Sequence, residues 1–355
     1  MRILDFYIGR VIASTTFITL AVFVSVSGII KFVEQMRAIG RGDYDLVHAA
    51  LFVLYSVPRD VEIFFPMAAL IGGLIGIGML ASNSELIVMQ AAGLSKLDII
   101  KSVMKTAALL IIISMAIGEW LAPSGEAKAR EIRAQAISGG SLISGRNGVW
   151  AKDGDYFVNI GDVQDQSKLK RIQIYGFNEQ LKIDRWISAQ SAIYQKNTWT
   201  LIDAEEFILE DNQIITKKYT NKVWKSSLTP NKLGVVTVTP ESLSIEGLLE
   251  YLDYLEANDQ DPSRYQLAFW RKLMQPLTVA VMLLVALSFI FGPLRSVSMG
   301  ARIMMGVFTG ILFFIFNEVL GSLSLVYQLP PVLGATMPSL VFIGAAWYLM
   351  NKKPA

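Results

Sequence analysis

IFFPMAALIGGLIGIGMLA occupies residues 63–81 and contains no charged side chain. A helix needs about 20 apolar residues to cross the hydrocarbon core of a bilayer, so this stretch predicts a membrane-spanning helix. Five more apolar runs occur in the chain, at residues 11–30, 106–122, 273–294, 303–329 and 332–350; the only charged residues in them are Glu119 and Glu318. The sequence therefore predicts six transmembrane helices.

The composition agrees with a membrane protein and argues against several kinds of catalytic site. Of the 355 residues, 53% are hydrophobic and 17% are charged, against about 25% charged residues in a soluble protein. With no cysteine and one histidine, His48, we expect no thiolate chemistry, no metal site and no histidine-centred triad. The nearest imitation of a phosphate-binding loop, at residues 140–147, has Arg146 where lysine is needed. We therefore expect a non-catalytic chain that binds no cofactor and does not hydrolyse ATP itself.

A different pattern fills the segment between the third and fourth apolar runs. From residue 148 to about residue 238, polar and apolar residues alternate with period two, as in half-buried strands. Segments 171–190, 192–202 and 205–219 each predict two strands, joined at Asn178-Glu179, Lys196-Asn197 and Asp211-Asn212. We expect an all-β, mostly antiparallel domain here.

Residues 239–258 predict an amphipathic helix that connects this domain to the fourth span. Its apolar residues recur at helical spacing on one face, namely Ile245, Leu248, Leu249, Leu252 and Leu255. The predicted division is a transmembrane half at 1–135, a β-domain at 136–240, a connecting helix at 241–262 and a second transmembrane half at 263–355.

The orientation of the chain follows from its six spans and its charges. Six spans place both termini on one side of the membrane and the β-domain on the other. The lysine and arginine counts of the two sides are similar and do not decide which side is cytoplasmic. Fewer acidic residues lie in the segments on the side of the termini, so we predict that this side is cytoplasmic.

Six stretches resemble one known family: IKFVEQMRAIGRGDYD, VPRDVEIFFPMAALIGGLIGIGMLASNSELIVMQAAG, IGEWLAP, GVWAKDG, TPNKLGVV and ALSFIFGPLRSV. These stretches resemble the permeases of the lipopolysaccharide export system (LptF/LptG), and the LptG branch more closely than the LptF branch. The resemblance implies a subunit of an ABC-type transporter in the inner membrane of a Gram-negative bacterium. Such a subunit extracts lipopolysaccharide from the periplasmic leaflet and passes it through an open β-jellyroll toward the outer membrane.

The resemblance also implies partners and a place in the cell. The partners are an LptF permease, a dimer of the LptB ATPase, and LptC with the LptA periplasmic bridge beyond it. In such a system ATP is used by the ATPase subunit, and this chain binds no cofactor. Lipopolysaccharide is the ligand, and no nucleic acid is expected. The chain is expected to cross the inner membrane several times, with its β-domain in the periplasm.

SNSELIVMQAAGLS, at residues 82–95, predicts a short helix between two spans. Ser82 and Glu85 have the spacing of a capping box, and Gly93 suits a left-handed helix stop. The residues alone leave open whether Glu85 does more than cap the helix. The resemblance implies a coupling helix at about 82–93, in which Glu85, Leu86, Val88 and Met89 contact the ATPase.

Basic residues gather near the ends of the spans on the β-domain side. Snorkelling and local ion pairs, such as Lys31 with Glu34, are one interpretation. The resemblance favours another, in which the side chains bind the phosphates of lipid A, because arginine and lysine both suit phosphate. The predicted set, which Arg271 and Lys272 extend, is Lys31, Arg37, Arg59, Arg130 and Arg133.

Phenylalanines in the spans are candidates for the wall of an acyl-chain cavity, namely Phe64, Phe65, Phe313 and Phe314. The alternative for each is that it packs between helices or faces lipid. Glu119 and Glu318 lie late in their spans, so we expect them at the membrane interface and assign them no proton coupling.

Three other classes of protein are alternatives to a lipopolysaccharide export permease. A membrane-bound periplasmic sensor needs a cytoplasmic output domain, for which the inner segments are too short. A lipid-modifying enzyme needs a cluster of catalytic residues that the sequence does not offer. The permease of another ABC exporter, for lipids or lipoproteins, differs mainly in the substrate, which only the resemblance indicates.

Overall fold

The computed structural model describes residues 2–138, 143–165, 167–178, 182–195, 198–210, 213–226, 228–229, 239–291 and 297–351. The chain forms two compact units. The first comprises Met1–Lys31, Ser56–Glu126 and Gln266–Ala355, and the second comprises Phe32–Tyr55 and Ala127–Tyr265.

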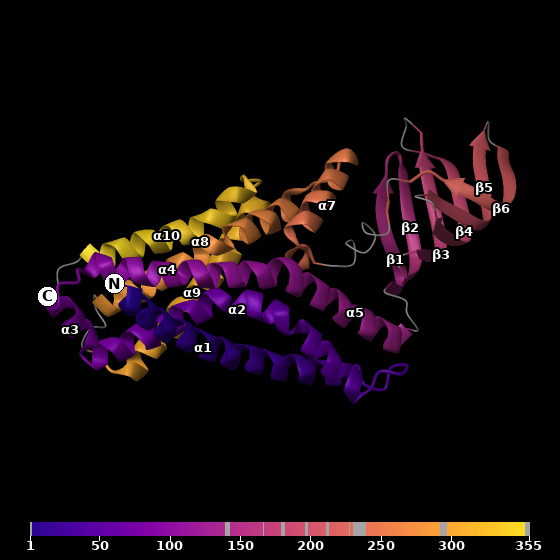
Figure 1. The fold of residues 1–355 in the computed structure, drawn as a ribbon. Coiled ribbons are helices and arrows are strands. Elements are labelled where there is room, and N and C mark those ends of the chain that lie inside the picture. The colour runs from indigo at the N-terminus through magenta and orange to yellow at the C-terminus, as the bar shows by residue number, and fades with distance from the viewer. Residues whose placement is uncertain are drawn as a thin grey trace. The chain divides into compact units, whose positions relative to one another are not determined.

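Within the described ranges, six helical segments are long and apolar enough to cross a membrane, which confirms the predicted spans. The helices are α1 (Arg2–Met36), α2 (Leu46–Ser82), α3 (Glu85–Ala91), α4 (Lys96–Ala116), α5 (Ala122–Ser138), α8 (Ser263–Phe291), α9 (Met299–Val326) and α10 (Pro331–Asn351) (Figure 1). A short π-helix, η1 (Ile117–Leu121), joins α4 to α5, so a single span runs through the three.

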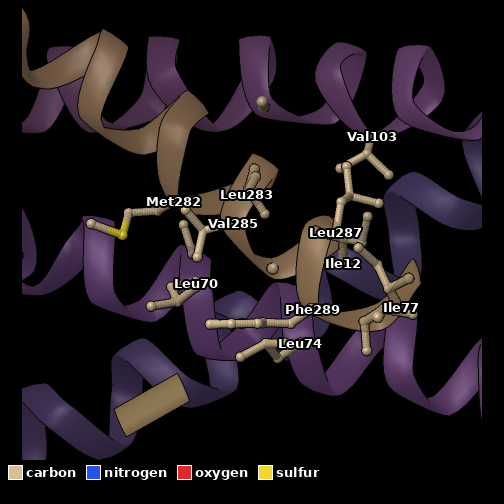
Figure 2. Packing of buried hydrophobic residues seen from close by; sticks show 14 of the residues in the cluster. Ile12, Leu70, Leu74, Ile77, Val103, Met282, Leu283, Val285, Leu287 and Phe289 are labelled. Carbon is tan, nitrogen blue, oxygen red and sulfur yellow. The ribbon is translucent and has the colours of Figure 1, made fainter. Parts of the chain in front are cut away.

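The core of the first unit, which we call the helical unit, is built mainly from side chains of α1, α2, α4 and α8, with contributions from α3, α9 and α10. Figure 2 shows Ile12, Leu70, Val103 and Leu287 among the side chains that fill it, and all four are fully buried. Glycine allows α1 and α2 to approach closely, because a Cβ at Gly72 would lie 2.6 Å from the backbone nitrogen of Thr16. This agrees with the role in helix packing that small residues have in membranes.

The second unit contains one antiparallel sheet whose strands follow one another in chain order (Figure 1). Its strands are β1 (Ile143–Asp153), β2 (Tyr156–Asp165), β3 (Lys168–Phe177), β4 (Ile183–Gln195), β5 (Thr198–Glu210) and β6 (Gln213–Trp224). The inserted, mostly antiparallel β-domain predicted from the sequence is therefore confirmed. The three predicted turns fall between β3 and β4, β4 and β5, and β5 and β6, although most of their residues lie outside the described ranges.

The number of strands predicted for residues 171–219 is wrong, because β4 and β5 each join two segments that the pattern had separated. The burial pattern shifts by one residue within β2, β3, β4 and β5. The buried residues on either side of the shift are Ile160 and Val163, Leu169 and Ile172, Ala189 and Ala192, and Leu201 and Ala204. These shifts lie side by side across the sheet, where Arg171 and Asp203 adopt left-handed conformations with φ of 55° and 52°. A local change of backbone conformation within a strand thus interrupts the alternation of polar and apolar residues, and the sequence pattern then suggests a strand end where there is none.

Helix α7 (Ile245–Ala257) packs against this sheet. Its buried side includes Leu248, Tyr251 and Leu255, whereas Leu249, predicted to share that side, is 46% exposed. The Tyr254 hydroxyl donates to the carbonyl oxygen of Lys152 at the end of β1. The connecting helix therefore belongs to the same unit as the β-domain.

Candidate functional site

Two basic side chains predicted to bind phosphate pair with carboxylates of α2. Lys31 Nζ on α1 lies 2.7 Å from Asp60 Oδ1, and Arg59 Nη1 lies 2.7 Å from Glu62 Oε2. The side chains of Asp60 and Glu62 are only 3% and 6% exposed. The predicted pair of Lys31 with Glu34 is therefore replaced by a contact between two helices.

Glu62 is the centre of a larger contact that joins three parts of the helical unit. Lys272 Nζ on α8 lies 3.3 Å from Glu62 Oε1, and the Lys272 side chain is 8% exposed. Gln275 Nε2, one turn further along α8, donates to the carbonyl oxygen of Glu62 at 3.2 Å and to Ser114 Oγ of α4 at 3.3 Å. A Cβ at Gly118 in η1 would lie 2.8 Å from Glu62 Oε1, so the carboxylate rests directly on the π-helix.

A neighbouring arginine on α8 makes a separate pair with α9. Arg271 Nη1 lies 3.1 Å from Glu318 Oε1, and Arg271 Nη2 donates to the carbonyl oxygen of Asn317 at 2.7 Å. Glu318 is 51% exposed, as expected for a residue near the end of its span. Glu119, on η1, is half-buried and also has an interaction partner.

The cluster around α2 contains, among the described ion pairs, two carboxylates and three cations. Charged groups in a membrane-embedded protein are costly unless they are paired, which explains why each carboxylate contacts a cation. Within the described part of the chain, Asp60 Oδ2 is buried and has no hydrogen-bond partner. The cluster therefore contains cations that could bind an anion. It also contains one carboxylate, Asp60, with an oxygen that accepts no hydrogen bond from the described residues.

The predicted phosphate-binding residues are divided between the two units of the chain. Lys31 and Arg59 belong to the helical unit and pair with Asp60 and Glu62 of α2. Arg37, Arg130 and Arg133 belong to the other unit, where Arg37 and Arg133 are exposed and Arg130 is half-buried. The guanidinium carbon of Arg133 lies 5.9 Å from the ring centre of Phe52.

Sequence reasoning missed Asp60, Glu62 and Gln275. A signal for the acids was present, because Asp60 and Glu62 directly precede an apolar run and Glu62 lies three residues after Arg59. Acidic residues at the start of a span are expected to have a partner or a function. No sequence signal identifies the partners Lys272 and Gln275, which lie some two hundred residues away.

The phenylalanines assigned to an acyl-chain cavity have different surroundings. Phe65 is fully buried, and Phe313 is 7% exposed and meets Phe342 edge-on at 4.9 Å. Phe64 stacks on Phe23 at 5.7 Å, and Phe314 is 50% exposed. Phe65 and Phe313 therefore pack between helices, whereas Phe314 is accessible to lipid.

The capping box predicted at Ser82 and Glu85 is wrong. Ser82 is still helical, as the last residue of α2, and its hydroxyl donates to the carbonyl oxygen of Gly78 at 2.9 Å. Ser84 caps α3 in a left-handed conformation without a side-chain hydrogen bond. A capping box does form one loop later, where Ser95 and Asp98 begin α4.

The stop predicted at Gly93 is confirmed. Gly93 has a φ of 95°, and its N–H donates to the carbonyl oxygen of Gln90 at 3.0 Å. Leu94 N–H donates to the carbonyl oxygen of Met89 at 3.1 Å, which completes a Schellman motif. Helix α3 is thereby confined to Glu85–Ala91.

The side chains of α3 face in two directions. Leu86 and Met89 are 5% and 7% exposed and belong to the core of the helical unit, whereas Ile87 and Val88 are 55% and 65% exposed. Of the apolar residues predicted to contact an ATPase, only Val88 is therefore accessible in the isolated chain. Glu85 is half-buried, and its Oε2 accepts a hydrogen bond of 2.8 Å from the Tyr7 hydroxyl.

The end of α2 that leads to α3 is held by a buried arginine. Arg302, on α9, is 3% exposed, and its Nη1 donates to the carbonyl oxygen of Gly78 at 2.8 Å and to Ser82 Oγ at 3.0 Å. The short helix is thus connected to α1 through Tyr7 and, by way of the end of α2, to α9.

Comparison with known proteins identifies close relatives along the whole chain. The family model for the lipopolysaccharide export system permease LptF/LptG matches residues 6–352. The chain is 50% identical over 354 residues to the lipopolysaccharide export system permease protein LptG of Escherichia coli strain K12. The aligned residues make up 99% of this chain and 98% of that protein. The chain is 49% identical over 352 residues to the protein of the same name from Haemophilus influenzae strain KW20, with 99% and 98% covered.

Proposed function

Because this chain belongs to the LptF/LptG family of lipopolysaccharide export system permeases, and is therefore a multi-pass permease subunit of that system, we propose that it extracts lipopolysaccharide from the periplasmic leaflet of the inner membrane. The lipid is then passed to a periplasmic β-jellyroll bridge toward the outer membrane. The observation that carries this proposal is the cluster around α2, where cations suited to an anionic headgroup lie among apolar spans.

Lys31, Arg37, Arg59, Arg130 and Arg133 bind the lipid phosphates in this proposal. Arg59 offers two parallel hydrogen bonds to a phosphate, and Lys31 offers a compact charge. Both already hold an oxyanion in the form of a carboxylate at 2.7 Å, which supports their suitability for phosphate oxygens.

The acyl chains remain in apolar surroundings throughout the transfer. Exposing a methylene group to water costs about 0.8 kcal/mol, so a single chain of a dozen carbons would cost roughly 10 kcal/mol. Exposed aromatic side chains of the spans, such as Phe314, offer the first apolar contact. The next is the apolar interior of the β-domain, which lies in the periplasm in this proposal. Ile160, Ile172 and Leu201 belong to this interior and are buried there.

ATP is hydrolysed by a separate ATPase that binds helix α3 on the cytoplasmic side. Glu85 supplies a carboxylate, and Ile87 and Val88 supply exposed apolar surface beside it. The Schellman motif gives this helix a defined end, and the hydrogen bond from Tyr7 connects it to α1. A movement of α3 that the ATPase causes is therefore transmitted to the spans. The proposed assembly contains an LptB dimer, an LptF permease, and LptC leading to LptA.

Co-purification tests this proposal most simply. The tagged chain is expressed with the candidate ATPase and permease, the assembly is isolated, and its bound lipid is identified by mass spectrometry. We expect a complex containing a phosphorylated glycolipid, and we expect Val88→Asp to lose the ATPase while the second permease stays bound. A matched control is Val47→Asp, because Val47 is also an exposed valine, 61% accessible, but lies on α2 outside the proposed ATPase contact. A complex without phosphorylated glycolipid, or an ATPase that stays bound to Val88→Asp, contradicts the corresponding part of the proposal.

A further inference from the structure

The cations of the α2 cluster are already occupied by carboxylates of the same chain. Lys31 holds Asp60, and Arg59 and Lys272 share Glu62, with distances of 2.7, 2.7 and 3.3 Å between the charged atoms. A phosphate that binds Lys31 and Arg59 therefore competes with contacts that these side chains already make.

We propose that Asp60 and Glu62 are internal counter-ions that a phosphate of the bound lipid displaces, and that this exchange loosens α2 from α1, α8 and η1. The inference deepens the proposed function and rests on its assignment of Lys31 and Arg59 to the headgroup. It adds two acidic residues to the machinery and gives the bound headgroup a direct effect on helix packing.

The chemistry of the two anions favours the exchange. A phosphate monoester carries a charge of about −1.5 to −2 near neutral pH and three strong acceptor oxygens, whereas a carboxylate carries a single charge. Asp60 is the weaker competitor in a further respect, because its Oδ2 is buried and has no partner within the described residues. Lys31 therefore gains acceptors when it turns from Asp60 to a phosphate.

The displaced carboxylates explain why the exchange moves helices. A buried carboxylate that loses its cation is strongly destabilising, so Asp60 must reach water or another donor once the phosphate is bound. Glu62 keeps Lys272 as its partner, but it must shift away from Arg59. For Glu62 this requires movement of its neighbours, because it touches Gly118 of η1 and its backbone carbonyl accepts from Gln275 of α8. The movement occurs at the π-helix in this proposal, since single-turn π segments occur frequently at functional sites.

Lipid binding by the complete export complex in nanodiscs tests the inference. The probes are diphosphorylated lipid A and the same lipid A with both phosphates removed. If Asp60 and Glu62 compete with phosphate, Asp60→Asn and Glu62→Gln each tighten binding of the phosphorylated probe about tenfold, the effect of one charge-assisted hydrogen bond. Binding of the dephosphorylated probe stays the same. If the two acids only support the fold, the variants bind the phosphorylated probe equally or more weakly, which overturns the inference.

Further variants separate this inference from the proposed function. Lys31→Gln and Arg59→Gln are expected to weaken binding of the phosphorylated probe. If they do not, the phosphate assignment itself is wrong, whatever the acidic variants do. Asp5→Asn is the matched control, because Asp5 pairs with Lys105 at 2.6 Å between α1 and α4 and takes no part in the cluster.

A double variant keeps the test valid if Glu62→Gln alone does not assemble. Glu62→Gln with Lys272→Met removes both members of the buried pair, so Lys272 is not left without a counter-ion. Arg59 then lacks its carboxylate, and the double variant is still expected to bind the phosphorylated probe more tightly than the wild type. Unchanged or weaker binding by an assembled double variant overturns the inference for Glu62.

Discussion

Replacing Glu62 with glutamine removes the carboxylate that lies between Arg59 and Lys272. The two cations are 15% and 8% exposed, so neither is well solvated once its partner is neutral. Removal of one member of a buried ion pair costs about 3–5 kcal/mol, and we expect a loss in this range for Glu62→Gln.

Lys272→Met is expected to cost less, because Glu62 keeps Arg59 as its partner. The loss is about 1.5–3 kcal/mol, the value of a hydrogen bond to a charged group. The double variant removes both members, so we expect it to be more stable than Glu62→Gln alone. This order follows from the sharing of one carboxylate by two cations.

Reversible unfolding of the purified protein in mixtures of detergent and sodium dodecyl sulfate measures these differences. All variants are compared in a buffer without phosphate or added lipid, so that no external anion replaces Glu62. A free energy of unfolding for Glu62→Gln equal to that of the wild type would refute the reasoning. A double variant whose loss equals the sum of the two single losses would show that Glu62 and Lys272 are not coupled.

Three other predictions concern the helix starts, the β-domain and the helix packing. Ser95→Ala is expected to cost about 1 kcal/mol and to speed hydrogen exchange at the start of α4, whereas Ser82→Ala leaves exchange there unchanged. Burial alone raises the pKa of Glu206, but hydrogen bonds from Lys222 and Tyr219 outweigh it and hold the pKa below its ordinary value. Its contribution to stability is therefore present above the unfolded pKa of about 4.3 and is lost as the pH falls through the lower folded pKa. Accordingly, Glu206→Gln should destabilise the domain at pH 7 but not at strongly acidic pH in thermal unfolding, and an equal effect at both contradicts this. Gly72→Val is expected to force α1 and α2 apart at a cost of about 1–3 kcal/mol in the detergent assay, whereas Gly344→Val, in open space, is not.

The sequence reveals features that depend on neighbouring residues and hides those that depend on distant ones. The six spans follow from uninterrupted apolar runs, and Gly93 marks the end of α3 through its own conformation. The strand count fails because the burial pattern shifts within β4 and β5 without ending either strand, in β5 beside the left-handed residue Asp203. The capping box at Ser82 is wrong because α2 has not yet ended there. Inside a helix, a serine hydroxyl can donate to the carbonyl oxygen four residues earlier, which for Ser82 is that of Gly78.

The candidate site, too, can be predicted from the sequence only in part. Basic residues near the spans identify Lys31 and Arg59 as candidates. Their carboxylate partners come from the fold, since Lys31 meets Asp60 across two helices and Glu62 meets Lys272 from the other half of the chain. The side of α3 that stays accessible, with Ile87 and Val88, also depends on how the helix packs and cannot be read from its short sequence.

The most direct test of the account is a structure of the complete export complex bound to diphosphorylated lipid A. We predict phosphate oxygens within about 3 Å of Lys31 Nζ and of the Arg59 guanidinium, with Asp60 and Glu62 turned away from both. A lipid phosphate bound elsewhere, with the two ion pairs of 2.7 Å still intact, would contradict it.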